Sequence, residues 1–122
     1  ADERGIVVDV TLTRGPLGSR PTEEALTNVE DHCRAAQALA AALRGFGNVY
    51  IDMANERDVR DARFVPYEEL AAIKQAIREA DPGRLVTASG VDDGSAKHLR
   101  GHLEVAGTDF ICPHRPRGPE AL

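Results

Sequence analysis

Carboxylate, amide and imidazole side chains stand where predicted strands of this sequence end. Asn55 and Glu56 directly follow the mostly apolar residues 49–54, and His114 follows the apolar residues 110–112. A positioned glutamate or histidine can transfer protons during catalysis. The same side chains also bind metal ions. The residue types therefore leave two kinds of chemistry open, acid and base catalysis and metal binding.

Each of these residues also has an ordinary structural interpretation. Glu56 could be a solvated acid at the start of a loop, paired with Arg57 or Arg60. Asparagine readily turns the chain after a strand, so Asn55 could serve only the local backbone. His114 lies among prolines and arginines, where it could be an ordinary loop histidine.

Two further pairs are interpreted structurally. Asp92 and Asp93 fit a turn followed by a helix cap. His98 and His102 are spaced to share one helix face, but Gly101 lies between them and no glutamate completes an HExxH pattern. We interpret these histidines as a surface pair rather than as metal ligands.

The elements that must position these residues alternate along the chain. Strands are predicted at residues 5–12, 48–54, 85–89 and 108–112, and the first has the unbroken apolar character of a strand buried on both faces. Thr27-Asn28-Val29-Glu30 has the form of a capping box before the first helix. Pro66 fits the first turn of the second helix, and Gly101 interrupts a weaker third helix at residues 95–105.

This βαβαβαβ order predicts a parallel sheet with right-handed crossovers. The sheet is either an arc of a closed (β/α) barrel, which we favour, or an open doubly wound sheet. Both architectures place functional residues in the loops that follow the strands. The segment Arg14-Gly15-Pro16-Leu17-Gly18 lacks the spacing of a phosphate-binding glycine loop.

Composition excludes several classes of partner. The net charge is −5, from 20 acidic and 15 basic residues, so no positive field would attract nucleic acid. No apolar run approaches the roughly 20 residues that cross a bilayer, so we expect a soluble protein without a membrane partner. Cys33 and Cys112 share no metal-binding spacing and are expected to be buried thiols. The cellular compartment and the oligomeric state stay open.

The segment Ile51-Asp52-Met53-Ala54-Asn55-Glu56 resembles the fourth strand of the glycoside hydrolase clan of (β/α)8 barrels that includes the cellulase-like family 5 enzymes. In that family Asn-Glu ends the strand, the glutamate is the general acid and base, and the asparagine binds the hydroxyl next to the anomeric carbon. The resemblance implies these roles for Glu56 and Asn55.

Neighbouring units agree with this resemblance. The first predicted strand is similar to the third strand of the family, with Asp9 at the family aspartate and Thr11 in place of its histidine. The last is similar to the sixth strand, where His114 matches a histidine and implies a substrate contact, while Pro116 replaces a tyrosine. By this resemblance, residues 1–122 form an incomplete barrel domain that runs from the third to the sixth strand unit.

The resemblance implies a fragment of a retaining glycoside hydrolase with a carbohydrate substrate and no cofactor or metal. Glycosidic cleavage needs one carboxylic acid to protonate the leaving oxygen and a second carboxylate to support the anomeric carbon. Glu56 can be only one of these. In this clan the other is a glutamate after the seventh strand, so we expect the isolated chain to be inactive.

Two other functions stay open. In a metal-dependent barrel hydrolase or isomerase, Glu56, His114 and Asp9 would be ligands at the strand ends. A non-catalytic barrel would bind carbohydrate without cleaving it. Aromatic residues make up only 4% of the chain and tryptophan is absent, so this sequence gives no support for a polysaccharide groove.

Overall fold

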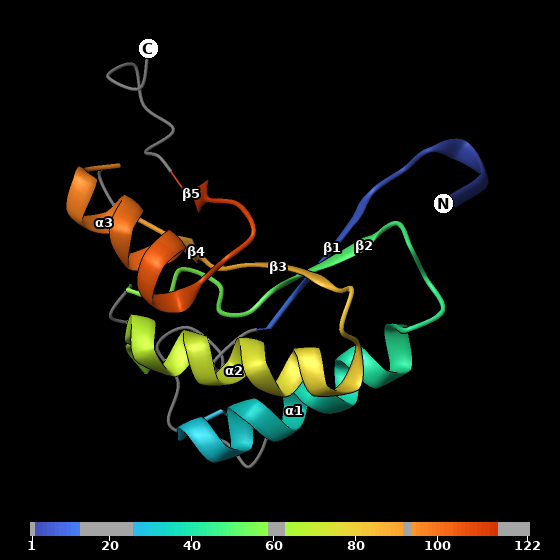
Figure 1. The fold of residues 1–122 in the computed structure, drawn as a ribbon, viewed down its shortest axis with the longest axis horizontal. Helices are drawn as coiled ribbons and strands as arrows, with labels where there is room; N and C mark the ends of the chain where they lie inside the picture. Colours follow the sequence, from blue (N-terminus) through green and yellow to red (C-terminus); the bar gives the residue numbers. More distant parts are fainter. Residues whose placement is uncertain (1, 13–25, 59–62, 92–93, 115–122) are drawn as a thin grey trace.

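A computed structural model describes residues 2–12, 26–58, 63–91 and 94–114 of the chain. Strands and helices alternate in the predicted order (Figure 1). The elements are η1 (Asp2–Arg4), β1 (Val8–Thr11), α1 (Val29–Leu43), β2 (Val49–Asp52), α2 (Tyr67–Ala80), β3 (Leu85–Thr87), β4 (Ser89–Gly90), α3 (Ala96–Arg100), η2 (Gly101–Ala106) and β5 (Cys112–Pro113).

All of the strand pairs are parallel in the described part of the chain. β1, β2 and β3 form one sheet in this order, with Val10 opposite Ile51 and Ile51 opposite Val86. β4 and β5 form a second ladder, with Ser89 opposite Cys112. Because β3 and β4 are nearly consecutive, the carboxyl ends of β1, β2, β4 and β5 follow one another along one edge. The prediction of an α/β fold with parallel strands is confirmed.

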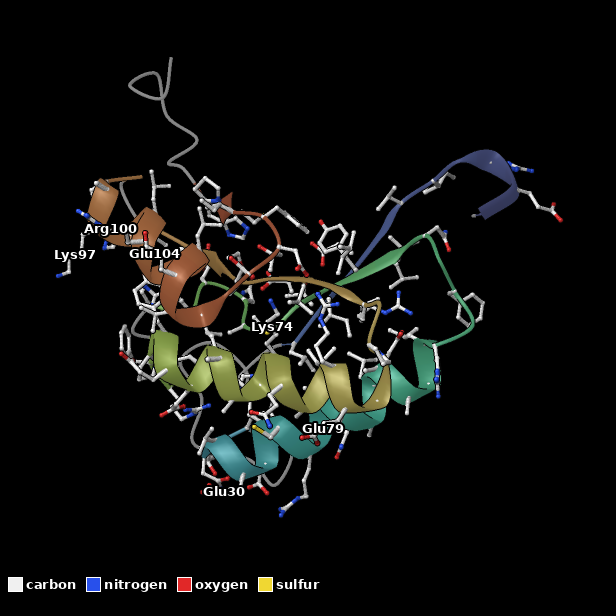
Figure 2. The ribbon with its side chains drawn as sticks, viewed as in Figure 1. Glu30, Lys74, Glu79, Lys97, Arg100 and Glu104 are labelled. Carbon is white, nitrogen blue, oxygen red and sulfur yellow. The ribbon has the colours of Figure 1, made fainter. Side chains whose placement is uncertain are left out.

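The core lies between the sheet and two helices. Figure 1 shows α1 and α2 side by side on one face of the sheet. Leu70, Ile73 and Ile77 of α2 are fully buried, as their spacing along one helix face predicts. Ile51 of β2 and Met53, the residue directly after this strand, belong to the same core cluster and are also fully buried. Figure 2 shows charged side chains such as those labelled on α3 and η2 extending away from this core.

The helix starts agree with the sequence to within one residue. The N-cap of α1 is Asn28 rather than Thr27, and its side-chain oxygen accepts a hydrogen bond of 2.8 Å from the amide of Asp31. The predicted capping box is therefore displaced by one position. Pro66 precedes α2 as its N-cap, and Asp81 ends it.

The predicted interruption of the third helix at Gly101 is a change of helix type there, not a break in the helix. The chain passes there from the α-helical α3 to the π-helical η2, and Gly107 ends the helix with a left-handed φ of 68°. A Cβ atom at Gly101 would overlap the ring of Tyr67. Glycine is required at this position because an aromatic ring packs against its backbone.

The first strand is more exposed than predicted. Ile6 and Val7 expose 51% and 66% of their surface, and β1 is the edge strand of the described sheet. The prediction of a strand buried on both faces is wrong for these residues, because β2 is the only described strand that pairs with β1.

The last strand is shorter than predicted and begins later. Residues 108–111 are not part of this strand, because Asp109 hydrogen-bonds to β3 with its side chain as well as with its backbone. Its amide donates to the carbonyl of Val86 at 2.9 Å, and its carboxylate accepts from the amide of Val86 at 2.8 Å. The ladder with β4 starts only at Cys112.

Two expectations from composition concern membranes and thiols. Among the described residues, no helix has the length and apolar character needed to span a membrane. Cys33 and Cys112 are free and only partly buried, rather than fully buried as expected. Burial raises the pKa of both thiols, which keeps them protonated near neutral pH.

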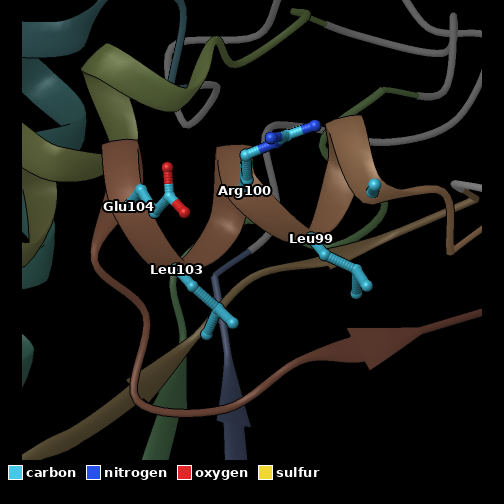
Figure 3. Close-up of a pocket in the computed structure, with 5 residues that line it drawn as sticks. Leu99, Arg100, Leu103 and Glu104 are labelled. Atoms are coloured by element: carbon cyan, nitrogen blue, oxygen red, sulfur yellow. The ribbon is translucent and has the colours of Figure 1, made fainter.

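A surface hollow runs along the last helical segment (Figure 3). Leu99 and Leu103 line it together with Ala96, Arg100 and Glu104. Both leucines are exposed in the described structure. The hollow contains none of the predicted site residues, and we assign it no chemistry.

Candidate active site at the carboxyl ends of the strands

Backbone hydrogen bonds continue beyond the end of β2 and hold the residues that follow it. The amide of Leu12 donates to the carbonyl of Asp52 at 2.9 Å, and the amide of Asn55 donates back to Leu12 at 3.0 Å. On the other side, the amide of Met53 donates to Thr87 at 2.8 Å. The chain that carries Asn55 is therefore fixed between its two neighbouring strands, at the edge where function was predicted.

Glu56 has an unusual backbone conformation. Its φ is +44°, and it is the only non-glycine residue with a positive φ in the described part of the chain. A non-glycine residue in the left-handed region costs about 1–2 kcal/mol. Its amide donates to the Ser89 hydroxyl at 3.0 Å, and the next amide, of Arg57, donates to the Ser89 carbonyl at 3.0 Å. Ser89 thus holds the chain on both sides of the Glu56 side chain.

The structure brings Glu56 and His114 together, although 58 positions separate them. The Nδ1 atom of His114 lies 3.2 Å from Oε1 of Glu56, and the two side chains are 40% and 34% exposed. The amide of His114 donates to the carbonyl of Gly90 at 2.8 Å, which ties it to the end of β4. The contact places an acid and a base within hydrogen-bond distance of each other, and solvent reaches both.

Asp52 and Ser89 form a buried polar contact that the sequence analysis missed. Asp52 is 2% exposed, and its carboxylate accepts from the Ser89 hydroxyl at 2.6 Å, from the Ser89 amide at 3.0 Å and from the Ala54 amide at 3.2 Å. Burial raises the pKa of Asp52, while these hydrogen bonds act in the opposite direction. The available signal was an aspartate inside an apolar strand, because a buried carboxylate needs partners.

A second polar cluster lies across β1 and β2. The Tyr50 hydroxyl donates to one oxygen of Asp9 at 3.0 Å, and Thr11 donates to the other at 3.1 Å. Burial and then the hydrogen bond with Asp9 raise the pKa of Tyr50 to about 12. The ring of Phe110 meets Tyr50 edge to face at 5.0 Å.

The metal-binding alternative gains no support from the ligand geometry. Asp9 bonds to Tyr50 and Thr11, whereas Glu56 contacts His114. Within residues 2–12, 26–58, 63–91 and 94–114, no three histidine, cysteine, aspartate or glutamate side chains gather closely enough to hold a metal ion.

Arg57, considered as an ion-pair partner of Glu56, and His102, considered as part of a surface pair, are both buried. Arg57 is 3% exposed, donates to the carbonyl of Val65 at 3.1 Å and lies 3.7 Å from the ring centre of Tyr67. His102 packs its ring on the same tyrosine at 5.1 Å and is 1% exposed, so His98 and His102 are not a surface pair. Several residues discussed from the sequence lie outside the described ranges: the segment 14–18, Arg60, Asp92, Asp93 and Pro116.

Comparison with known proteins adds a likeness of fold. No protein-family model and no curated protein sequence matches the chain. Among solved structures, it is similar to a GH5_18 glycoside hydrolase from Streptomyces cattleya in complex with GlcNAc, with 25% identity and a TM-score of 0.52. A variant of that enzyme, in complex with Manb1-4GlcNAc, is 24% identical with a TM-score of 0.54.

The fold resembles part of a family 5 enzyme. The two alignments cover 73% and 88% of this chain but only 27% and 30% of the enzymes. The chain therefore spans less than a third of the length of these relatives. The likeness supports the resemblance seen in the sequence at the level of the fold.

Proposed function

We propose that residues 1–122 are the central part of a (β/α)8 barrel of a retaining glycoside hydrolase, with Glu56 as its general acid and base. The observation that carries the proposal is the position of Glu56 at the carboxyl edge of a parallel sheet. There it adopts a left-handed φ and its carboxylate lies 3.2 Å from His114. Backbone strain of this kind gathers at functional sites. The likeness to glycoside hydrolases of family 5 also supports the proposal.

The surroundings of Glu56 suit a carboxyl group that exchanges protons. Its side chain is 34% exposed, so a glycosidic oxygen can reach it. The His114 nitrogen 3.2 Å away can donate a hydrogen bond to the carboxylate or accept one from the protonated acid. In the proposed mechanism Glu56 protonates the leaving oxygen and later removes a proton from water. Asn55 and His114 contact the sugar.

The proposed mechanism also needs a nucleophile. A retaining glycosidase needs a second carboxylate about 5–5.5 Å from the first. Asp52 is a poor candidate, because it is buried and its oxygens already accept three hydrogen bonds. We therefore propose that a later strand unit supplies the nucleophile.

For the substrate, we propose a short glycan that contains N-acetylglucosamine. The similar enzyme at 25% identity is in complex with GlcNAc. The low aromatic content of this chain agrees with a short glycan, since a long polysaccharide groove usually needs stacked rings.

The test uses the complete protein that contains this chain and a series of aryl glycosides with good and poor leaving groups. We expect Glu56→Gln to lower turnover of poor leaving groups by about 10²–10⁴-fold and of good ones far less, because only the former need a proton. Glu104→Gln, at an exposed helix position, is the matched control. Equal loss on all substrates would contradict the assignment. Sugar binding without turnover in the unaltered protein would favour the non-catalytic barrel.

A further inference from the structure

We infer that Ser89 and Asp52 are positioning residues that hold the Glu56 backbone so that its carboxyl faces the substrate. The inference rests on the function proposed for Glu56. The contacts form a chain: the amide of Glu56 donates to the Ser89 hydroxyl at 3.0 Å, and that hydroxyl donates to Asp52 at 2.6 Å.

Asp52 fixes the direction of the hydrogen bond that Ser89 makes. A serine hydroxyl has one proton, and whenever Asp52 is ionised its carboxylate can only accept that proton in a hydrogen bond. Because the Ser89 hydroxyl donates its proton to Asp52, a lone pair on the hydroxyl oxygen can accept the hydrogen bond from the Glu56 amide. The other oxygen of Asp52 accepts from the amides of Ser89 and Ala54, which prevents the carboxylate from turning away.

Burial keeps this arrangement in place. Ser89 is 0% and Asp52 2% exposed, so water does not compete for their hydrogen bonds. Charge-assisted hydrogen bonds of about this length are among the stronger ones in proteins.

The position of Ser89 explains how Glu56 keeps a conformation that is unfavourable for a glutamate. Strained residues persist only where their surroundings over-determine them. Ser89 bonds the amide of Glu56 through its hydroxyl and the amide of Arg57 through its carbonyl. Losing the hydroxyl removes one of these two bonds and leaves the sheet contacts of the strand in place.

Two variants test the inference, and a control comes from β3, directly before β4. Ser89→Ala removes the hydroxyl, and Asp52→Asn keeps the size of the side chain while replacing an acceptor with a donor. Thr87→Val is the control, because Thr87 is also fully buried and its hydroxyl donates to the carbonyl of Phe110, not to Glu56.

The measurements are hydrogen exchange of the peptide that contains Glu56 and steady-state kinetics with poor and good leaving groups, in the complete protein. For Ser89→Ala we expect exchange at the Glu56 amide to rise about tenfold, the factor that corresponds to one lost hydrogen bond. We expect kcat on poor leaving groups to fall while KM stays nearly constant, with a smaller effect on good ones. Asp52→Asn should act in the same direction.

The outcomes separate this inference from the proposed function. If Ser89→Ala matches Thr87→Val in exchange and in leaving-group dependence, Ser89 does not position Glu56 and the inference is wrong. If exchange at Glu56 rises only in Ser89→Ala and Asp52→Asn while Glu56→Gln leaves turnover intact, the structural role stands and the proposed function fails. If one variant does not fold, the other still decides between these results.

Discussion

Replacing Arg84 by methionine should destabilise the fold. Arg84 precedes β3, at the amino ends of the strands, whereas the candidate site lies at their carboxyl ends. Arg84 is 5% exposed. Its guanidinium donates to the carbonyls of Leu43, Phe46 and Val49 at 2.6, 2.9 and 2.5 Å, and to Asp81 at 2.8 to 3.0 Å. One side chain thus joins the end of α1, the start of β2 and the end of α2.

The magnitude follows from what the substitution leaves behind. Removing one partner of a buried ion pair costs about 3–5 kcal/mol, since the other charge stays buried without compensation. The side chain of Asp81 is 12% exposed, so solvent offsets part of this cost. We therefore expect Arg84→Met to lower the free energy of unfolding by about 3 kcal/mol. This is a large share of the roughly 5–15 kcal/mol that stabilises a typical domain.

Urea denaturation monitored by circular dichroism measures this effect. A loss of about 3 kcal/mol should lower the transition midpoint by about 1–3 M. Arg44→Met is the control, because Arg44 is exposed at the end of α1. Adding Asp81→Asn to Arg84→Met should recover about 1 kcal/mol, because the lone buried charge is then removed. A midpoint equal to that of Arg44→Met would show that the Arg84 contacts contribute little to stability. A further loss in the double variant would show that Asp81 is not left as an uncompensated charge.

Two more predictions concern packing and pH. Gly101→Ala should lower the free energy of unfolding by about 1–3 kcal/mol, because its methyl group overlaps the ring of Tyr67. Thermal melting measures this effect. An unchanged melting temperature would contradict the close packing of the Tyr67 ring on the Gly101 backbone. Burial raises the pKa of Asp52, so the folded state binds its proton more tightly than the unfolded state does. The contribution of Asp52 to stability is therefore complete below the ordinary aspartate pKa and is lost as the pH rises through the raised value. The asparagine in Asp52→Asn cannot ionise. The stability of this variant relative to the unaltered chain should therefore increase with pH, measured by urea denaturation between about pH 3 and pH 7. A stability difference that does not change with pH would contradict the raised pKa.

Hydrophobic periodicity along the chain was enough to predict most of the helices and strands and the order in which they alternate. Apolar spacing identified the buried face of α2 through Leu70, Ile73 and Ile77, and a short apolar run identified β2. These patterns are local, since the period of hydrophobic residues follows directly from helix and strand geometry. The alternation of strands and helices then predicted parallel pairing, and with it the edge where Asn55 and Glu56 lie.

The residues that surround Glu56 come from segments that meet only when the strands pack together. Ser89 lies 33 positions from it in the sequence and His114 lies 58 positions away, and no local pattern pairs them. The left-handed φ of Glu56 was equally hidden, because it depends on hydrogen bonds that form only when neighbouring strands meet. The exposure of β1 depends in the same way on which strands lie beside it. Local periodicity encodes the elements, whereas contacts between distant segments are fixed only by how those elements pack.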